Sequence, residues 1–178
     1  QLETIFDLFT QAGHTGSPAD GKTCTACHNG TATEVNGWIT SNVPTEGYEP
    51  GQTYQVTITN TGSGKKGFQA SPQNANGDLQ GALSAGTGMK LVGNGKYIEH
   101  SQAQTSDPAT WTFDWTAPDP GVGEVTFYGA FVTGFDNVSK ESVTFQQKGA
   151  SSIKTSNDLG TSIYPNPVTG TSFKLQLN

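Results

Sequence analysis

The sequence contains no arginine, and its nine cationic residues are lysines spread along the chain. Fifteen acidic residues give the 178-residue chain a formal net charge of −6 at pH 7. We therefore expect no nucleic-acid binding, because phosphate contacts need clustered cations. The chain also lacks any apolar run near the roughly 20 residues that a membrane-spanning helix needs, so we expect no membrane span.

Charged residues are scarce as well, at 13% of the chain, and hydrophobic residues make up only 32%. A chain that is polar but weakly charged differs from most disordered chains. Its 23 glycines, with abundant threonine, serine and asparagine, are typical of a turn-rich all-β protein exposed to solvent. The chain begins Gln1-Leu2-Glu3 without an initiator methionine, which predicts an exported protein whose signal peptide has been removed.

Apolar and polar residues alternate with a period of two from about residue 48 onward, which is the pattern of half-buried strands. Residues 65–73 predict a strand broken by Pro72, and residues 88–102 predict a hairpin with its turn at Gly93-Asn94-Gly95. The predicted inward faces carry Tyr54, Val56 and Ile58; Trp111, Phe113 and Trp115; Val125 and Phe127; and Val143 and Phe145. Six or seven short strands separated by turns predict an all-β antiparallel sandwich.

Composition divides the chain into four parts. Residues 1–40 form an N-terminal segment, in which residues 2–12 fit a short amphipathic helix and, nearly as well, a strand. The rest of that segment is an irregular loop rich in glycine and threonine. The sandwich is expected over 41–148, a Ser/Gly-rich linker over 149–160, and the start of a further strand-forming segment over 161–178.

Both cysteines of the chain lie in the motif Cys24-Thr25-Ala26-Cys27-His28 of the irregular loop. Two thiols at this spacing add to the two vinyl groups of one haem, and the adjacent histidine then becomes the proximal ligand of the iron. Because no cysteine lies outside the motif, a chance match is less expected, and we favour the attachment of one haem c.

Three other uses of the motif remain open from the residues alone. Cys24 and Cys27 could form a disulfide that closes a very small loop. They could hold structural zinc with His28, but zinc needs four protein ligands, and only His14 or His100 could complete the set. A thioredoxin-like redox pair is the weakest alternative, because the expected βαβ surroundings are missing.

A haem iron would also need a distal ligand, for which His100, His14 and Met89 are the candidates. His100 has the same strand parity as Ile98 and is therefore expected to point inward, where the alternative is a hydrogen-bonded core histidine. His14 is expected to be a solvated loop side chain, and Met89 to pack in the core.

Ordered stretches of residues 13–147 resemble the bacterial surface domain termed choice-of-anchor V, which is similar to the Reeler domain of animal extracellular proteins. The resemblance rests on "TGSPADGKTCTACHNG", "GYEPGQTYQVTI", "KGFQASPQNANGDLQGAL", "YIEHS", "WTFDWTAP" and "GEVTFYGAFV". It implies an immunoglobulin-like, Reeler-like sandwich. Bacterial members commonly carry the Cys-x-x-Cys-His motif and a histidine matching His100. The resemblance therefore implies haem bound through Cys24 and Cys27, with His28 proximal and His100 distal.

The tail stretch "SIYPNPVTG" resembles the start of the type A C-terminal sorting domain of type IX secretion, which implies a place at the outer cell surface. Either this tail or residues 2–12 could also add a strand to a neighbouring subunit and so build a homo-oligomer or filament. The function expected is that of an extracellular c-type cytochrome that passes electrons between redox partner proteins. With both axial positions filled by protein, we expect no enzyme. The alternative is a surface adhesion or structural module with a Cys24–Cys27 disulfide and no haem.

Overall fold

The structure is a computed structural model that describes residues 12–149, 161–164 and 174–177. The predicted helix or strand at the N-terminus lies outside the described residues, apart from Ala12, and so does nearly all of the predicted linker. The segment from residue 12 to residue 32, called the N-terminal segment below, contains no strand and only one short 3-10 turn, η2 (Cys24–Ala26). The irregular loop predicted around the cysteines is therefore confirmed.

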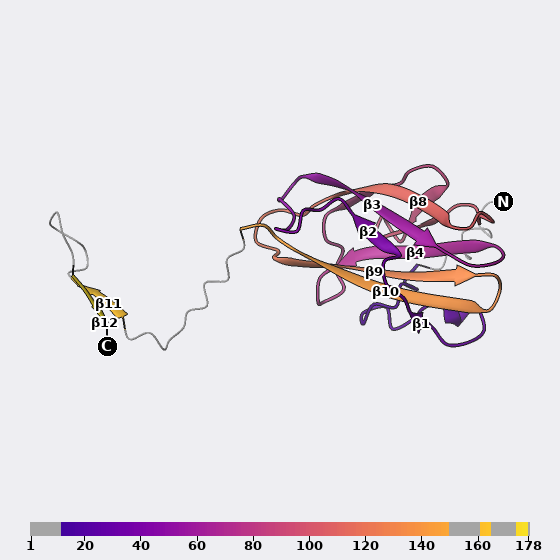
Figure 1. Ribbon diagram of the computed structural model, residues 1–178, viewed down its shortest axis with the longest axis horizontal. Coiled ribbons are helices and arrows are strands. Elements are labelled where there is room, and N and C mark those ends of the chain that lie inside the picture. The colour runs from indigo at the N-terminus through magenta and orange to yellow at the C-terminus, as the bar shows by residue number, and fades with distance from the viewer. Residues whose placement is uncertain (1–11, 150–160, 165–173, 178) are drawn as a thin grey trace.

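Ten strands form two sheets that face one another, as Figure 1 shows for β3 and β8 on one side and β9 and β10 on the other. The smaller sheet has the order β2 (Ile39–Ser41), β3 (Thr53–Asn60), β8 (Ala109–Thr116) and β5 (Ala82–Ser84). The larger sheet has the order β1 (Thr33–Glu34), β10 (Asn137–Gln146), β9 (Glu124–Thr133), β4 (Lys66–Gln73), β7 (Tyr97–His100) and β6 (Met89–Val92). Every pairing is antiparallel except the short one between β1 and β10. The predicted all-β sandwich is confirmed.

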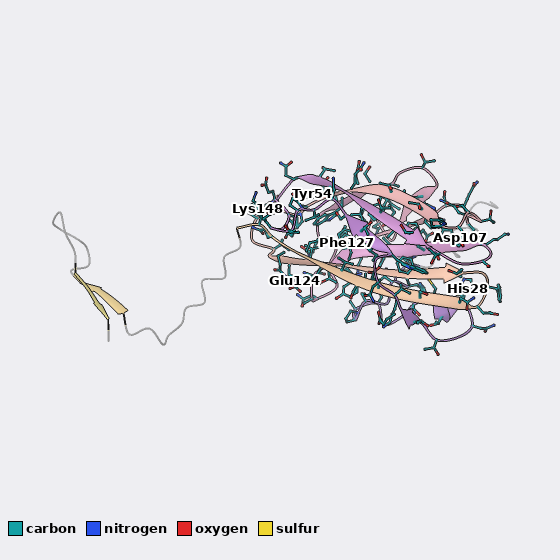
Figure 2. The ribbon with its side chains drawn as sticks, viewed as in Figure 1. His28, Tyr54, Asp107, Glu124, Phe127 and Lys148 are labelled. Carbon is teal, nitrogen blue, oxygen red and sulfur yellow. The ribbon has the colours of Figure 1, made fainter. Side chains whose placement is uncertain are left out.

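The core lies between the two sheets and is built from the alternation read in the sequence. In β8 every second residue is buried, among them Trp111, Phe113 and Trp115. Trp115 is 0% exposed and meets Phe127 edge to face at 5.2 Å between ring centroids. Phe127 lies in the middle of the molecule in Figure 2. Each fully buried side chain of this size contributes about 1.5–3 kcal/mol to folding, so these aromatic side chains contribute strongly to stability.

Strand β4 is the central strand on which the site depends, and Pro72 does not break it, contrary to the prediction. The strand continues to Gln73 and pairs with β9 along its whole length. On its other side β7 pairs with β4 only at Gln69 and Ala70. A proline is tolerated where a strand has no ladder partner on one side, because no backbone N–H is then missing.

The predicted hairpin of residues 88–102 is confirmed as β6 and β7, with the turn at residues 93–96. Asn94 has φ +56 in this turn, a left-handed conformation that asparagine tolerates better than most residues. The turn fixes the register of the hairpin, so that Met89 lies opposite His100 at the other end. The end of β7 therefore delivers His100 to the edge of β4.

The last described residues pair with each other: β11 (Thr161–Tyr164) and β12 (Lys174–Leu177) form a two-stranded antiparallel sheet. The sequence predicted a strand-forming segment over 161–178, which agrees with this pairing. Within the described parts of the chain there is no helix long and apolar enough to span a membrane.

Candidate functional site

The cysteine motif folds into a single tight turn at the surface of the larger sheet. The amides of Cys27 and His28 both donate to the Cys24 carbonyl, at 3.2 and 2.9 Å, and the Thr23 side chain accepts from the Thr25 amide. In a 3-10 turn, side chains three residues apart lie on the same side. The turn therefore directs Cys24 and Cys27 to one side and places His28 directly after them.

His28 is oriented by the turn that joins β9 to β10. Its Nδ1 lies 2.8 Å from the carbonyl oxygen of Phe135, and its ring meets the Phe135 ring edge to face. A carbonyl oxygen only accepts, so Nδ1 carries the proton and Nε2 keeps its lone pair. A histidine that donates through one nitrogen to a backbone carbonyl and offers the other is arranged as a metal ligand.

The N-terminal segment is held against the sheet by further polar contacts. Asn29 donates to the Asp136 carboxylate at 3.2 Å. Asp20 accepts from Thr15 and, at 2.7 Å, from the hydroxyl of Tyr97 in β7. Burial, and then the neighbouring Asp20 carboxylate, raise the pKa of the Tyr97 hydroxyl. The hydroxyl therefore stays protonated and donates to Asp20 at all ordinary pH values. These contacts fix the segment that carries the motif.

His100 lies at the end of β7, where that strand separates from β4. Its Nδ1 is 3.1 Å from both the amide nitrogen and the carbonyl oxygen of Phe68. The last paired residues of β4 and β7 at this end are Gln69 and Glu99. Beyond them, the His100 side chain instead of a backbone pair contacts the Phe68 backbone. The amide only donates and the carbonyl only accepts, so the tautomer decides which bond forms. With the proton on Nδ1, the ring donates to Phe68 and leaves the lone pair of Nε2 for a ligand.

The motif and His100 line one cavity of about 410 Å³, together with His14. Phe68 and Val132 provide apolar wall, and Gly67 opens the wall beside His100. Volumes of this order are typical of sites for small molecules and cofactors. The cavity therefore brings together the four residues predicted to bind haem, from distant parts of the sequence: Cys24 and Cys27 for its attachment, and His28 and His100 for its iron. Figure 2 shows His28 at the end of the sandwich opposite to Glu124 and Lys148.

Charged residues line another side of the cavity. Glu99 accepts a hydrogen bond from the side-chain amide of Gln69 at 2.8 Å and forms an ion pair with Lys90 at 3.2 Å. Burial, and to a smaller extent the nearby Cys27 and Glu99, raise the pKa of the Cys24 thiol to about 12. Cys24 is therefore a neutral thiol at physiological pH. This is the reverse of a thioredoxin-like pair, whose nucleophilic cysteine needs a lowered pKa.

Two more of the alternative uses of the motif find little support in the geometry. No disulfide joins Cys24 and Cys27 in the structure. Within residues 12–149 and the two tail strands, no three histidine, cysteine or acidic residues are close enough together to hold a metal ion. A zinc ion needs four converging ligands, so this donor set does not suit zinc.

The other two predicted distal ligands lie in different places. Met89 packs in the hydrophobic core, with its terminal methyl group close to Gly86, as its alternative role predicted. His14, which was expected to be a solvated loop side chain, is half-buried and lines the cavity. Its backbone amide donates to the Gln69 side chain at 2.8 Å. His14 is therefore a second candidate for the distal position.

The residues present fit a haem better than they fit a single ion. A haem c with two histidine ligands would be attached through two thiols at its edge, and these four groups do not have to converge on a point. Cys24 and Cys27 share one turn of chain, and His28 and His100 each have a backbone carbonyl beside Nδ1. The sequence alone did not point to the carbonyls of Phe68 and Phe135 or to Gly67. Only the "GF" pair of the resemblance pointed to that part of β4.

Solved structures with low sequence identity share this architecture. The Reelin-N domain of F-spondin matches with a TM-score of 0.58 at 16% identity, over 69% of this chain and 94% of that chain. The fold is Reeler-like. Two crystal structures of the human F-spondin reeler domain agree, with TM-scores of 0.55 and 0.52 at 17% and 16% identity. They cover 66% and 65% of this chain, and 94% and 95% of their own chains.

The Reeler-like fold implied by the sequence resemblance is thus confirmed. No protein-family model and no curated protein matches the chain. Its place in the choice-of-anchor V family, and the sorting-domain character of its tail, stay predictions.

Proposed function

We propose that this chain is an extracellular, Reeler-like c-type cytochrome that carries one covalently attached haem for electron transfer. One observation carries the proposal: the Cys-x-x-Cys-His turn and His100 line the same cavity. The orientation of the two imidazoles adds support, because each has a backbone carbonyl at Nδ1, at 2.8 Å for His28 and 3.1 Å for His100.

Each residue has a distinct part in this proposal. Cys24 and Cys27 add to the two vinyl groups: each sulfur bonds to one vinyl carbon and the thiol hydrogen goes to the other, so no oxidant is needed. His28 offers Nε2 as the proximal ligand and His100 offers Nε2 as the distal ligand. The bound haem supplies a one-electron change of its iron between the ferric and ferrous states.

We propose no enzymatic activity, because two protein ligands leave the iron without an open position for a substrate. The partners are redox proteins that reach the end of the sandwich where His28 lies. The chain continues toward the tail from Lys148, which lies at the opposite end (Figure 2). Attachment to the cell surface through the C-terminal tail would therefore leave the cavity facing outward. A homo-oligomer or filament built by strand exchange belongs to the same proposal.

The mass of the intact protein tests the proposal directly. We expect the polypeptide mass plus one haem, and a Soret band that stays with the protein after extraction with acidified acetone. Cys24→Ala together with Cys27→Ala should abolish both signals. Met89→Leu is the matched control, because Met89 lies in the core, and it should keep both. A colourless protein at the polypeptide mass would reject the cytochrome.

A surface adhesion or structural module without haem is the second candidate, and the Reeler-like fold favours it. The disulfide between Cys24 and Cys27 that was expected to accompany it is not formed in the structure. A colourless protein that binds cells or matrix material, and whose Cys24→Ala variant behaves like the wild type, would favour this candidate.

A further inference from the structure

Gly67 in β4 needs an explanation, because a glycine inside a strand weakens it by roughly 0.5–1 kcal/mol relative to alanine. Its backbone does not require glycine, since its φ is not in the left-handed region. The reason is space. A Cβ built on Gly67 would lie 2.5 Å from Nε2 and 2.8 Å from Nδ1 of His100.

This close approach leaves the imidazole little freedom to give way. Its Nδ1 is held 3.1 Å from the backbone of Phe68, the residue that follows Gly67. The ring is also tilted against the Phe68 ring, at 6.4 Å between centroids. A methyl group at position 67 would therefore move the whole imidazole away from the Phe68 carbonyl.

Gly129 in the neighbouring strand β9 provides a comparison. It too lies in a strand without a left-handed φ, and a Cβ there would meet Ile39 Cδ1 at 2.9 Å and Phe131 Cζ at 3.0 Å. Those atoms belong to core side chains. Substitution at Gly129 disturbs packing, whereas substitution at Gly67 disturbs His100.

We propose that Gly67 is a positioning residue, which seats the His100 imidazole against Phe68 and thereby makes His100 the distal ligand of the iron. The inference rests on the proposed haem function and goes further, because it names the residue that holds the His100 imidazole in place. With alanine at position 67, the His100 imidazole would be displaced from the Phe68 backbone, and its Nε2 would be displaced with it.

The first test measures the iron. The variants are Gly67→Ala, His100→Ala and, as the matched control, Gly129→Ala, each with its intact mass taken first to establish covalent haem. In the reduced state we expect the wild type and Gly129→Ala to resist carbon monoxide. Gly67→Ala and His100→Ala should bind it at least tenfold faster, and added imidazole should restore the wild-type spectrum. Gly67→Ala with the wild-type spectrum and slow binding would overturn the inference.

The second test is a double-mutant cycle on unfolding, which reads the contact itself. We expect Gly67→Ala to destabilise the wild type but to have little effect in the His100→Ala background, where the ring is gone. Folding of the double variant where Gly67→Ala alone fails to fold would support the contact as well. Equal costs in the two backgrounds would overturn it. A wild-type mass without haem would reject the proposed function and the ligand role of His100, while the cycle would still report the contact between Gly67 and His100.

Discussion

The sandwich and the N-terminal segment are held in place by different forces. In the sandwich, continuous ladders join the strands, and apolar side chains such as Trp115 and Phe127 fill the space between the sheets. The N-terminal segment contains no strand, and hydrogen bonds anchor it to the sheet, for example between Asp20 and Tyr97 and between His28 and Phe135.

Because of this difference, the core of the sandwich sets the stability of the fold, whereas the N-terminal segment carries the residues of the candidate site. A hydrogen bond near the surface contributes about 0.5–1.5 kcal/mol net, which is less than one fully buried large side chain contributes. The segment that carries the motif therefore has its shape only while the sheet beneath it is folded. Changes in the core should lower stability without altering the site, and changes in the segment should do the reverse.

Cys24 gives the largest expected effect in the N-terminal segment, because its thiol is shielded from water. Burial raises its pKa from 9.0 to about 12, so at pH 8 its thiolate is about a thousandfold scarcer than that of an ordinary cysteine. In protein isolated without haem, we expect Cys24 to react with a thiol reagent correspondingly slowly, and faster only as the pH rises toward 12. The measurement uses Cys27→Ser, which leaves Cys24 alone, and Cys24→Ser as its control. Equal rates for the two variants would show that Cys24 is not buried.

Trp115→Ala should cause the largest loss of stability. Removing a buried tryptophan leaves a cavity and costs about 3–5 kcal/mol. Chemical denaturation measures the free energy of unfolding. The control is Phe135→Ala, since Phe135 is 69% exposed, and it should change stability by about 0.5 kcal/mol or less. Similar losses for the two would break the proposed division between core and surface.

Glu141→Ala should have the next largest effect, because this buried carboxylate in β10 ties the chain before β2 to the larger sheet. It accepts from the backbone amides of Gly37, Trp38 and Ile39 at 2.6, 2.8 and 2.8 Å. Leaving these donors without an acceptor should cost about 2–4 kcal/mol. The control is Glu34→Ala, which removes a surface ion pair with Lys140 and should cost about 1 kcal/mol at most. Unchanged denaturation of Glu141→Ala would contradict this role.

Tyr97→Phe should have the smallest effect, and a local one. It removes the donor to Asp20 and should cost about 1 kcal/mol. Hydrogen exchange should become faster at the Gly16 and Gly21 amides, whose bonds close the loop around Asp20, while the sheets stay protected. Tyr128→Phe is the control, because it leaves Asp20 untouched. Faster exchange across the whole sandwich would mean that the segment is part of the core after all.

Much of this molecule was predictable from short-range patterns. Alternation predicted the buried faces of β8 and β9, because successive side chains of a strand point to opposite sides of the sheet. The hairpin turn at Gly93-Asn94-Gly95 followed from residues that tolerate a positive φ. The break predicted at Pro72 was wrong, because the effect of a proline depends on which strands pair beside it. A short-range pattern of residues does not show that pairing.

The sequence by itself determined the chemistry available: two thiols and a histidine within five residues, in an all-β chain with few charges. Only the tertiary structure decided which other groups meet them. His100 reaches the cavity because β7 leaves β4 after Gln69, and Gly67 leaves room for its imidazole. The groups of Phe68 and Phe135 that orient the two imidazoles belong to backbone, which has the same chemistry at every residue. Their roles arise from position alone, and position is fixed by strand pairings between residues far apart in the chain.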